Sequence, residues 1–287
     1  MAGRGSGRSV PSGRGVKGYW AATRSPLVGV AVTLPLLLVY NVGLLVPGND
    51  TMNAADLLTR IVPQFGGLRA ILIANAILAV TSLVLLVVVF RKGLFRWSWW
   101  LTMCAEGIVY GVAMALGVHW LLGQVHLLDV AQAVAQTATQ TGAQAAAQAA
   151  AQAAAQTASS TATQAIEVVP RVPLFQVIVM SAGAGYWEEL VFRLGMVGLP
   201  LAAALRFGSK ERAATILRVG IVGLLAVAGS SVVFSALHYL GGQEIPGAYS
   251  FWYRTFSGVF FSALFLSRGF AVAAWTHFLY DVVVMSL

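Results

Sequence analysis

The strongest constraint on the fold is a series of long apolar runs that contain almost no charged residues. A helix that crosses a bilayer needs about 20 predominantly apolar residues, whereas about a quarter of the residues in a soluble domain are charged. Here 58% of 287 residues are hydrophobic, 10% are charged and the mean hydropathy is +0.78. We therefore expect an all-α, polytopic transmembrane helical bundle of about seven spans. The runs lie near residues 26–46, 69–90, 98–122, 173–204, 219–240, 253–268 and 269–287.

At two places these runs do not follow a simple pattern of one separate helix per run. The run 173–204 is long for one span and contains Pro200, so it is expected to tilt, to break or to form two shorter helices. The last two runs are separated only by Arg268. The number of spans near the end of the sequence therefore depends on how the chain turns at Arg268.

The net charge of +8 is distributed unevenly between the connecting segments. In a soluble protein such a charge would suggest nucleic-acid binding, but Lys and Arg in short loops instead set the membrane orientation. An N-terminus on the cytoplasmic side gives thirteen inner and four outer residues, so we expect that orientation and no nucleic-acid partner. The inner ones are Arg4, Arg8, Arg14, Lys17, Arg24, Arg91, Lys92, Arg96, Arg206, Lys210, Arg212, Arg218 and Arg268; the outer ones are Arg60, Arg69, Arg171 and Arg254.

Composition divides the chain into four segments. Residues 1–24 are rich in Gly, Ser and Arg and are expected to be a disordered basic cytoplasmic tail. Residues 25–128 hold the N-terminal transmembrane helices. Residues 129–167 repeat Gln every fourth position on an Ala background, which predicts a low-complexity insert, helical or disordered, outside the membrane on the extracytoplasmic side. Residues 168–287 form the remaining membrane core.

Charged residues are concentrated at one point in this core, in the stretch GYWEELVFRLG at residues 185–195. Glu189 and Arg193 are four residues apart, a spacing that places an ion pair on one helix face and reduces the cost of both charges in a membrane. Glu188 points about 100° away on an α-helix and has no local partner. An intramembrane carboxylate of this kind needs a partner on another helix or a chemical role.

Further polar residues lie within later apolar runs. FSALH ends at His238, and HFLYD places His277 and Asp281 on one helix face. Such residues can be structural groups that hold helices together. Their number in adjacent spans favours a functional cluster instead, because ionisable groups in membranes are rarely retained without a role.

Carboxylates with imidazoles can perform hydrolysis. A carboxylate can act as a general base toward water that attacks a carbonyl, and an imidazole can stabilise the developing oxyanion. Two histidines with carboxylates are also a legitimate zinc set. The sequence has no H-E-x-x-H motif, so we favour a reaction without a metal or other cofactor.

The three motifs together resemble one known family. EELVFR is E-E-x-x-x-R, FSALH is F-x-x-x-H and HFLYD is H-x-x-x-D, in that order. The pattern resembles the CPBP family of intramembrane proteases, which includes type II CAAX prenyl endopeptidases and bacterial Abi proteins. The resemblance covers about residues 173–287 and implies a polar cavity that opens toward the cytoplasm, where a peptide bond is hydrolysed.

The resemblance also implies roles for individual residues. Glu188 is the expected catalytic glutamate, His238 its partner in holding water, and His277 an oxyanion-side residue. Asp281 occupies a position that is Asn or Asp in the family; an ionised Asp cannot donate a hydrogen bond, so it is protonated, it orients His277, or the oxyanion role is reduced. The expected supporting residues are Glu189, Arg193 and Phe234.

Two other functions are compatible with the sequence. A non-catalytic immunity or scaffold protein would keep the fold without needing Glu188, and a proton-coupled transporter would use buried Glu and His as a relay. The favoured hypothesis is an endopeptidase of the cell membrane, specifically a bacterial plasma membrane. Its expected substrate is a membrane-associated protein or peptide. Glu106 pairs across helices or lines the cavity, and Gly183 and Gly185 are expected to allow close helix approach.

Overall fold

The computed structural model describes residues 16–46, 53, 55–56, 63–91, 93, 96–140, 172–207, 211–239 and 247–286. All regular elements within these residues are helices, which confirms the all-α prediction. The elements are α1 (Val16–Thr23), α2 (Pro26–Gly43), α4 (Pro63–Arg91), α5 (Trp97–Gln140), α7 (Leu174–Gly183), η1 (Ala184–Gly198), α8 (Leu199–Arg206), α9 (Arg212–Leu237), α10 (Ala248–Arg268) and α11 (Phe270–Ser286).

The long run that contains Pro200 forms one continuous helical path. α7, η1 and α8 follow one another without a break, because the residues at both junctions keep helical dihedral angles. Pro200 is the second residue of α8, and because it has no N–H, it donates no backbone hydrogen bond to the preceding turn at the junction with η1. The middle segment, η1, is π-helical over fifteen residues. π-Helical geometry is rare in proteins, and where it occurs it is often found at a functional site.

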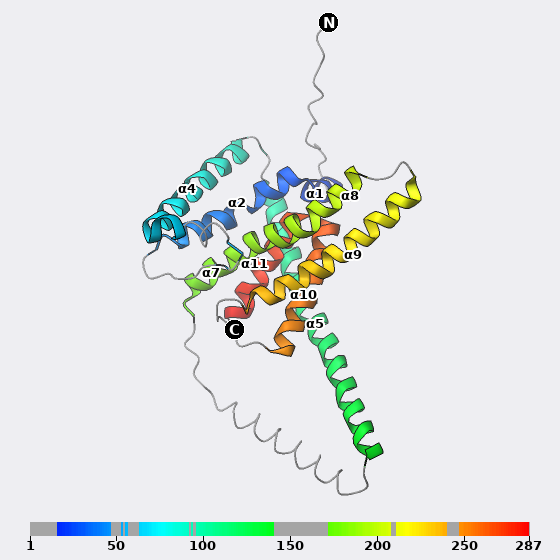
Figure 1. Cartoon of the computed structure of the whole chain (residues 1–287). Helices are drawn as coiled ribbons and strands as arrows, with labels where there is room; N and C mark the ends of the chain where they lie inside the picture. Colours follow the sequence, from blue (N-terminus) through cyan, green and yellow to red (C-terminus); the bar gives the residue numbers. More distant parts are fainter. Residues whose placement is uncertain are drawn as a thin grey trace.

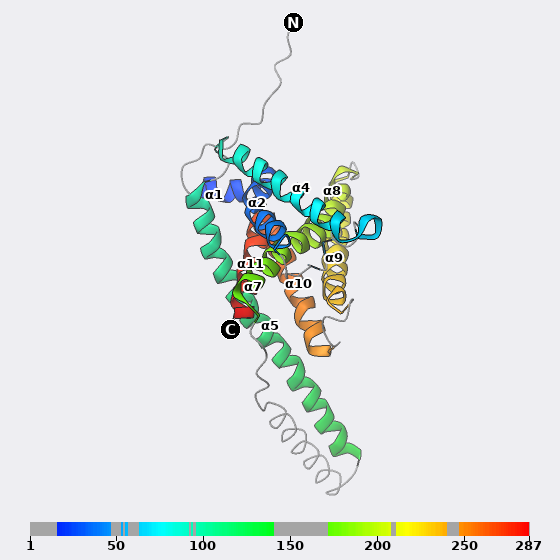
Figure 2. The same ribbon diagram turned by 90° about the vertical axis from the view of Figure 1, so that its left-hand side faces the viewer.

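Helix α11 lies at the centre of the bundle (Figures 1 and 2). It packs against α2, α5, α7, η1 and α10, and the residues from Phe270 to His277 are buried. Helices α9 and α10 pack together beside η1, and α4 lies on the outside of α2. The C-terminal motifs are therefore on helices that surround or form the core.

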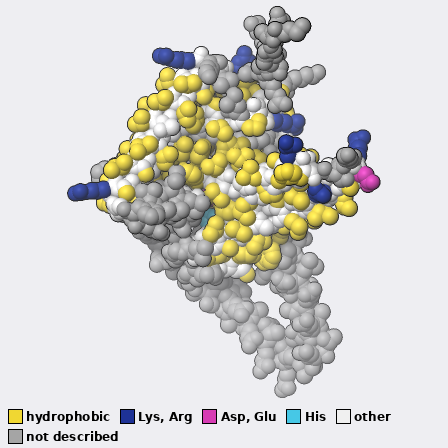
Figure 3. Space-filling view, turned by 45° about the horizontal axis from the view of Figure 1, so that its top comes forward, with side chains coloured by type: hydrophobic (Ala, Val, Ile, Leu, Met, Phe, Trp, Pro, Cys, Tyr) yellow, Lys and Arg dark blue, Asp and Glu magenta, His cyan; other side chains and the backbone are white. Residues whose placement is uncertain are grey.

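The outer surface is strongly apolar, as expected for a protein in contact with lipid. Leu68, Leu116 and Leu224 are each about 70% exposed, and apolar side chains cover much of the face in Figure 3. Three helical stretches, Gly66–Arg91, Trp97–Gln124 and Arg212–Leu237, are long and apolar enough to cross a membrane, and two shorter apolar helices accompany them. The chain is thus a membrane protein, while seven spans and a cytoplasmic N-terminus stay predictions.

Close helix approach at two glycines agrees with the expectation from sequence. A Cβ atom on Gly185 would lie 2.6 Å from the Ala274 carbonyl oxygen and 2.9 Å from Phe278 Cβ, both on α11. A Cβ atom on Gly183 would lie 2.6 Å from the Tyr40 ring on α2. The absence of side chains here lets the α7–η1 helix approach both neighbours.

The N-terminal segment differs from the sequence prediction at one end. Residues 1–15 of the expected disordered tail lie outside the described residues, but α1 is helical and buries Tyr19 and Ala22. Helix α1 departs from the expected disordered tail because Tyr19 and Ala22 belong to the buried apolar cluster that also contains residues of α2 and α11, and tertiary packing of this kind stabilises a short helix. Residues 141–171, which contain most of the Gln-rich insert, also lie outside the described residues. The four segment boundaries stay predictions.

Candidate active site

The expected ion pair between Glu189 and Arg193 is present and completely buried. Arg193 Nε lies 3.3 Å from Glu189 Oε2, and both side chains are 0% exposed. The guanidinium carbon also lies 4.7 Å from the Phe234 ring centroid and 5.4 Å from that of Phe261. Aromatic faces attract a cation, especially one removed from water. The pair joins η1 to α9 and α10, which is a structural role.

Glu189 also fixes the second histidine of the motifs. Its Oε1 atom lies 2.8 Å from His277 Nδ1, and Phe261 stacks on the imidazole with ring centroids 4.5 Å apart. Since an ionised carboxylate only accepts hydrogen bonds, Nδ1 is the donor in this contact. Glu189 therefore bridges Arg193 and His277, and it sets both the tautomer and the orientation of the ring.

The other nitrogen of His277 faces two further carboxylates. Nε2 lies 3.7 Å from Glu188 Oε2 and 3.6 Å from Asp281 Oδ2. One imidazole thus lies among Glu188, Glu189 and Asp281, and of these contacts only the one with Asp281 follows from a four-residue spacing. The π-helical geometry of η1 contributes, because consecutive side chains diverge less on a wider helix than the 100° expected for an α-helix.

Glu188 has a partner that the motifs did not predict. Asn53 Nδ2 donates a hydrogen bond of 2.7 Å to Glu188 Oε1, and the Glu188 residue is 4% exposed. Asn53 lies between α2 and α4, and its backbone N–H donates to the Tyr40 hydroxyl, which donates to Asp56. The only sequence signal was a polar residue in a connection between apolar runs, which does not identify a contact 135 positions away.

His238 reaches the same region from the end of α9. Its Nδ1 atom lies 2.8 Å from the Phe234 carbonyl oxygen, and the ring is close enough to Glu188 for an electrostatic interaction. The Phe234 ring packs edge-on between the two imidazoles, with centroids 5.0 Å from His238 and 6.0 Å from His277. The structure thus brings all seven expected site residues into one cluster. Of the two histidines, His277 is the one with a measured contact to Glu188, at 3.7 Å.

Glu106 belongs to a different polar cluster. Arg268 Nη2 donates to both of its carboxylate oxygens, at 3.0 and 2.7 Å, and the Tyr19 hydroxyl donates to Oε2 at 2.5 Å. Burial and the hydrogen bond to Glu106 raise the pKa of the Tyr19 phenol, so it stays a donor. Of the two alternatives, pairing across helices is the one found. Arg268, counted from sequence as a loop charge, is 2% exposed because it forms this pair.

Within the described residues, no group of three or more His, Cys, Asp or Glu side chains has the arrangement of a metal site. Both nitrogens of His277 instead face carboxylates. The residues best suited to a metal, Glu188, His238 and His277, are also those expected to handle water. The same three residues could therefore serve a metal-bound or a metal-free reaction.

The fold and the cluster define a class of protein: a helical membrane protein with a buried Glu–His site between its spans. The sequence model of the family described as type II CAAX prenyl endopeptidase Rce1-like matches residues 170–283. This range contains the three motifs, and it confirms the resemblance to CPBP-type membrane proteases over this part of the chain. No curated protein and no solved structure was found to match the chain.

Proposed function

We propose that the protein is an intramembrane endopeptidase that hydrolyses a peptide bond in a membrane-associated protein or peptide. The observation that carries this proposal is the environment of Glu188. One carboxylate oxygen is held by Asn53, and the other is directed toward His277 Nε2 inside an otherwise apolar core. Arg193 pairs with Glu189 rather than with Glu188, so among the described contacts Glu188 has the Asn53 hydrogen bond and the longer contact with His277.

In the proposed reaction Glu188 is the general base. It accepts a proton from a water molecule while the water oxygen forms a bond to the peptide carbonyl carbon, which converts the carbonyl into an oxyanion. The protonated Glu188 then returns the proton to the leaving nitrogen, and the carbon–nitrogen bond breaks. Water is consumed and two peptide ends are released, so the step needs no other reactant.

The histidines have separate roles in this proposal. His238 helps Glu188 to hold the water, since it lies within electrostatic range of the carboxylate. His277 stabilises the oxyanion through Nε2, which requires the protonated ring because Nδ1 already donates to Glu189. Asp281 lies 3.6 Å from the same nitrogen. Of the roles considered for Asp281, orienting a cationic His277 fits this contact best.

We also propose that the reaction is metal-free, with no resident cofactor. The carboxylate contacts on both His277 nitrogens support this, because they give the ring partners without a metal ion. The expected result is that cleavage persists after treatment with a strong chelator. Loss of cleavage that is restored by Zn²⁺ would instead assign Glu188, His238 or His277 to a metal.

The decisive experiment compares protein termini in membranes from cells that express the wild type and Glu188→Gln at equal levels. Gln keeps the size of the side chain and can still accept the Asn53 hydrogen bond, but it is not a base. A matched control is Glu211→Gln, an exposed glutamate before α9. Termini that vanish only in Glu188→Gln establish the protease and identify substrates. Identical profiles in all three strains would favour the scaffold or transporter instead.

A further inference from the structure

The helix ends separate into two faces of the bundle. The ends of α1, α4, α8 and α10 and the starts of α2, α5, α9 and α11 lie on one face, toward the top of Figure 1. The opposite face has the end of α2, the start of α7, the end of α9, the start of α10 and the end of α11. The first face is basic: its described residues include Arg24, Arg91, Arg96, Arg206 and Arg212.

The residues that reach the site from connections come from the opposite face. Asn53 lies between α2 and α4, and His238 directly follows the C-terminus of α9. On α11, Asp281 lies nearer to Ser286 than to Phe270. By contrast, the polar contacts nearest the basic face, among Tyr19, Glu106 and Arg268, close that end of the bundle.

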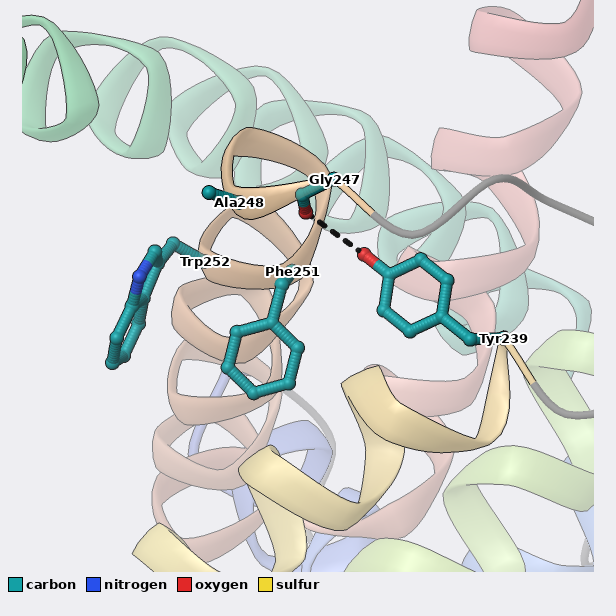
Figure 4. Close-up of a pocket in the computed structure, with 5 residues that line it drawn as sticks. All are labelled: Tyr239, Gly247, Ala248, Phe251 and Trp252. Carbon is teal, nitrogen blue, oxygen red and sulfur yellow. Dashed lines mark hydrogen bonds between the residues drawn. The ribbon is translucent and has the colours of Figure 1, made fainter.

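A pocket of about 470 Å³ lies between the residue after His238 and the start of α10, on the face opposite the basic one (Figure 4). It is lined by Tyr239, which follows His238, and by Gly247, Ala248, Phe251 and Trp252 at the start of α10. The Tyr239 hydroxyl is held by Ser250 Oγ at 2.7 Å and by the Gly247 carbonyl oxygen at 3.3 Å. A lining that is mainly aromatic suits an apolar side chain of an extended peptide.

The distribution of Lys and Arg orients these two faces. Arg268 is buried in its pair with Glu106, so it does not count as a loop charge. Among the described residues, the helix ends at the basic face carry Arg24, Arg91, Arg96, Arg206, Arg212 and Arg218, whereas those at the opposite face carry Arg69 and Arg254. Positively charged loops are retained on the cytoplasmic side of a membrane. The face with the pocket, Asn53 and His238 is then the extracytoplasmic one.

We infer that the site is reached from the extracytoplasmic side, and that its substrates are exported or outward-facing peptide segments anchored at that surface. This is the reverse of the cytoplasmic opening that the family resemblance implied. The inference about substrates rests on the proposed peptidase function. The inference about access rests only on topology, and the two can be tested separately.

Access can be tested with two matched cysteine variants. Cys104 is the sole cysteine, so Cys104→Ser gives a background without thiols. Ala248→Cys marks the pocket, and Ala213→Cys marks the basic face; both alanines are exposed in the first turn of a helix. A membrane-impermeant maleimide should label Ala248→Cys in intact cells and Ala213→Cys only after permeabilisation. Labelling in denaturant confirms that each thiol is present.

The reverse labelling pattern, or labelling of Ala248→Cys only after permeabilisation, would overturn the inference. The substrates provide the second test: cleavage sites that depend on Glu188 should lie in exported or outward-facing segments. Cleavage sites in cytoplasmic segments would refute extracytoplasmic access while leaving the peptidase intact. If labelling follows the expected pattern but no Glu188-dependent termini exist, the proposed peptidase function fails and the topology stands.

Discussion

The two adjacent glutamates have different surroundings, and these indicate different roles. Glu189 uses Oε2 for Arg193 and Oε1 for His277, so both oxygens serve internal contacts. Glu188 has one oxygen held by Asn53 and directs the other toward His277 at a longer distance of 3.7 Å. We therefore expect Glu189 to stabilise the fold and Glu188 to react.

Substitution by glutamine should separate these roles in thermal unfolding of the purified, detergent-solubilised protein. Glu189→Gln leaves the buried Arg193 charge without its counter-ion, which destabilises by about 3–5 kcal/mol. Glu188→Gln keeps an acceptor for Asn53 and weakens only the longer contact with His277, so its melting temperature should fall much less than that of Glu189→Gln. Equal melting temperatures for the two variants would contradict the assignment of Glu189 as the structural residue.

Asn53 is expected to position Glu188 rather than to react. Asn53→Ala removes a hydrogen bond to a charged group, worth about 1.5–3 kcal/mol, which corresponds to a roughly ten- to hundredfold lower cleavage rate. Asn75→Ala is a control, because Asn75 is a buried amide on α4 that donates only to the Ile71 carbonyl in the recorded contacts. A positioning role also predicts that Asn53→Gln recovers part of the rate; equal rates for Asn53→Ala and the wild type would refute it.

At the scale of helices, the contact between η1 and α11 determines the distance from Glu188 to His277. A methyl group at Gly185 would meet the backbone and Phe278 of α11, so Gly185→Ala should force the helices apart at a cost of about 1–3 kcal/mol. Cleavage per folded molecule should also fall, because the glutamates and His277 are on opposite sides of this contact.

Gly220→Ala is the matched control for this substitution. Gly220 is also in a helix, α9, and a Cβ atom there would meet nothing within 4 Å. Alanine is the better helix former by about 1 kcal/mol, so this variant should be as stable as the wild type or more stable. If Gly185→Ala behaves like Gly220→Ala in melting temperature and cleavage, the close contact has no effect on the site.

Predictions from sequence were most successful for contacts between residues close together in the chain and for segments whose apolar length requires a helix in a membrane. Apolar length predicted helices in each of the seven runs, and the four-residue spacing predicted the Glu189–Arg193 pair. The sequence could not predict that Asn53 holds Glu188 or that Arg268 pairs with Glu106, because the partners are 135 and 162 positions apart. Contacts of this kind depend on how whole helices pack. The π-helical geometry of η1 likewise had no sequence signal.

At the scale of the whole molecule, the polar groups form two clusters on the central helices. The Glu106 cluster joins α1, α5 and α10 near the basic face, and the Glu188 cluster joins η1, α9, α10 and α11 with the connection that holds Asn53. Each cluster offsets charges that would be costly alone in a membrane. The proposed hydrolysis requires its reacting groups to be held in place, and these two clusters fix the helices that carry them.

The Gln-rich insert is expected to contribute nothing to this arrangement. Helix α5 extends to Gln140, well beyond the apolar stretch that ends at Gln124, and projects from the bundle in Figures 1 and 2. Biased composition rarely encodes a site. Replacing residues 141–167 with a Gly/Ser linker of the same length should leave the melting temperature and the Glu188-dependent termini unchanged.

In a second variant, the order of residues 141–167 is shuffled without changing their composition. This variant separates an effect of composition from an effect of residue order. If the linker variant stays folded but loses cleavage while the shuffled variant keeps it, the Ala/Gln composition itself recruits substrate. If both lose cleavage with an unchanged melting temperature, the order of residues in the insert recognises something. Either result would contradict the interpretation of the insert as a passive connection, and would place part of the substrate selection outside the membrane.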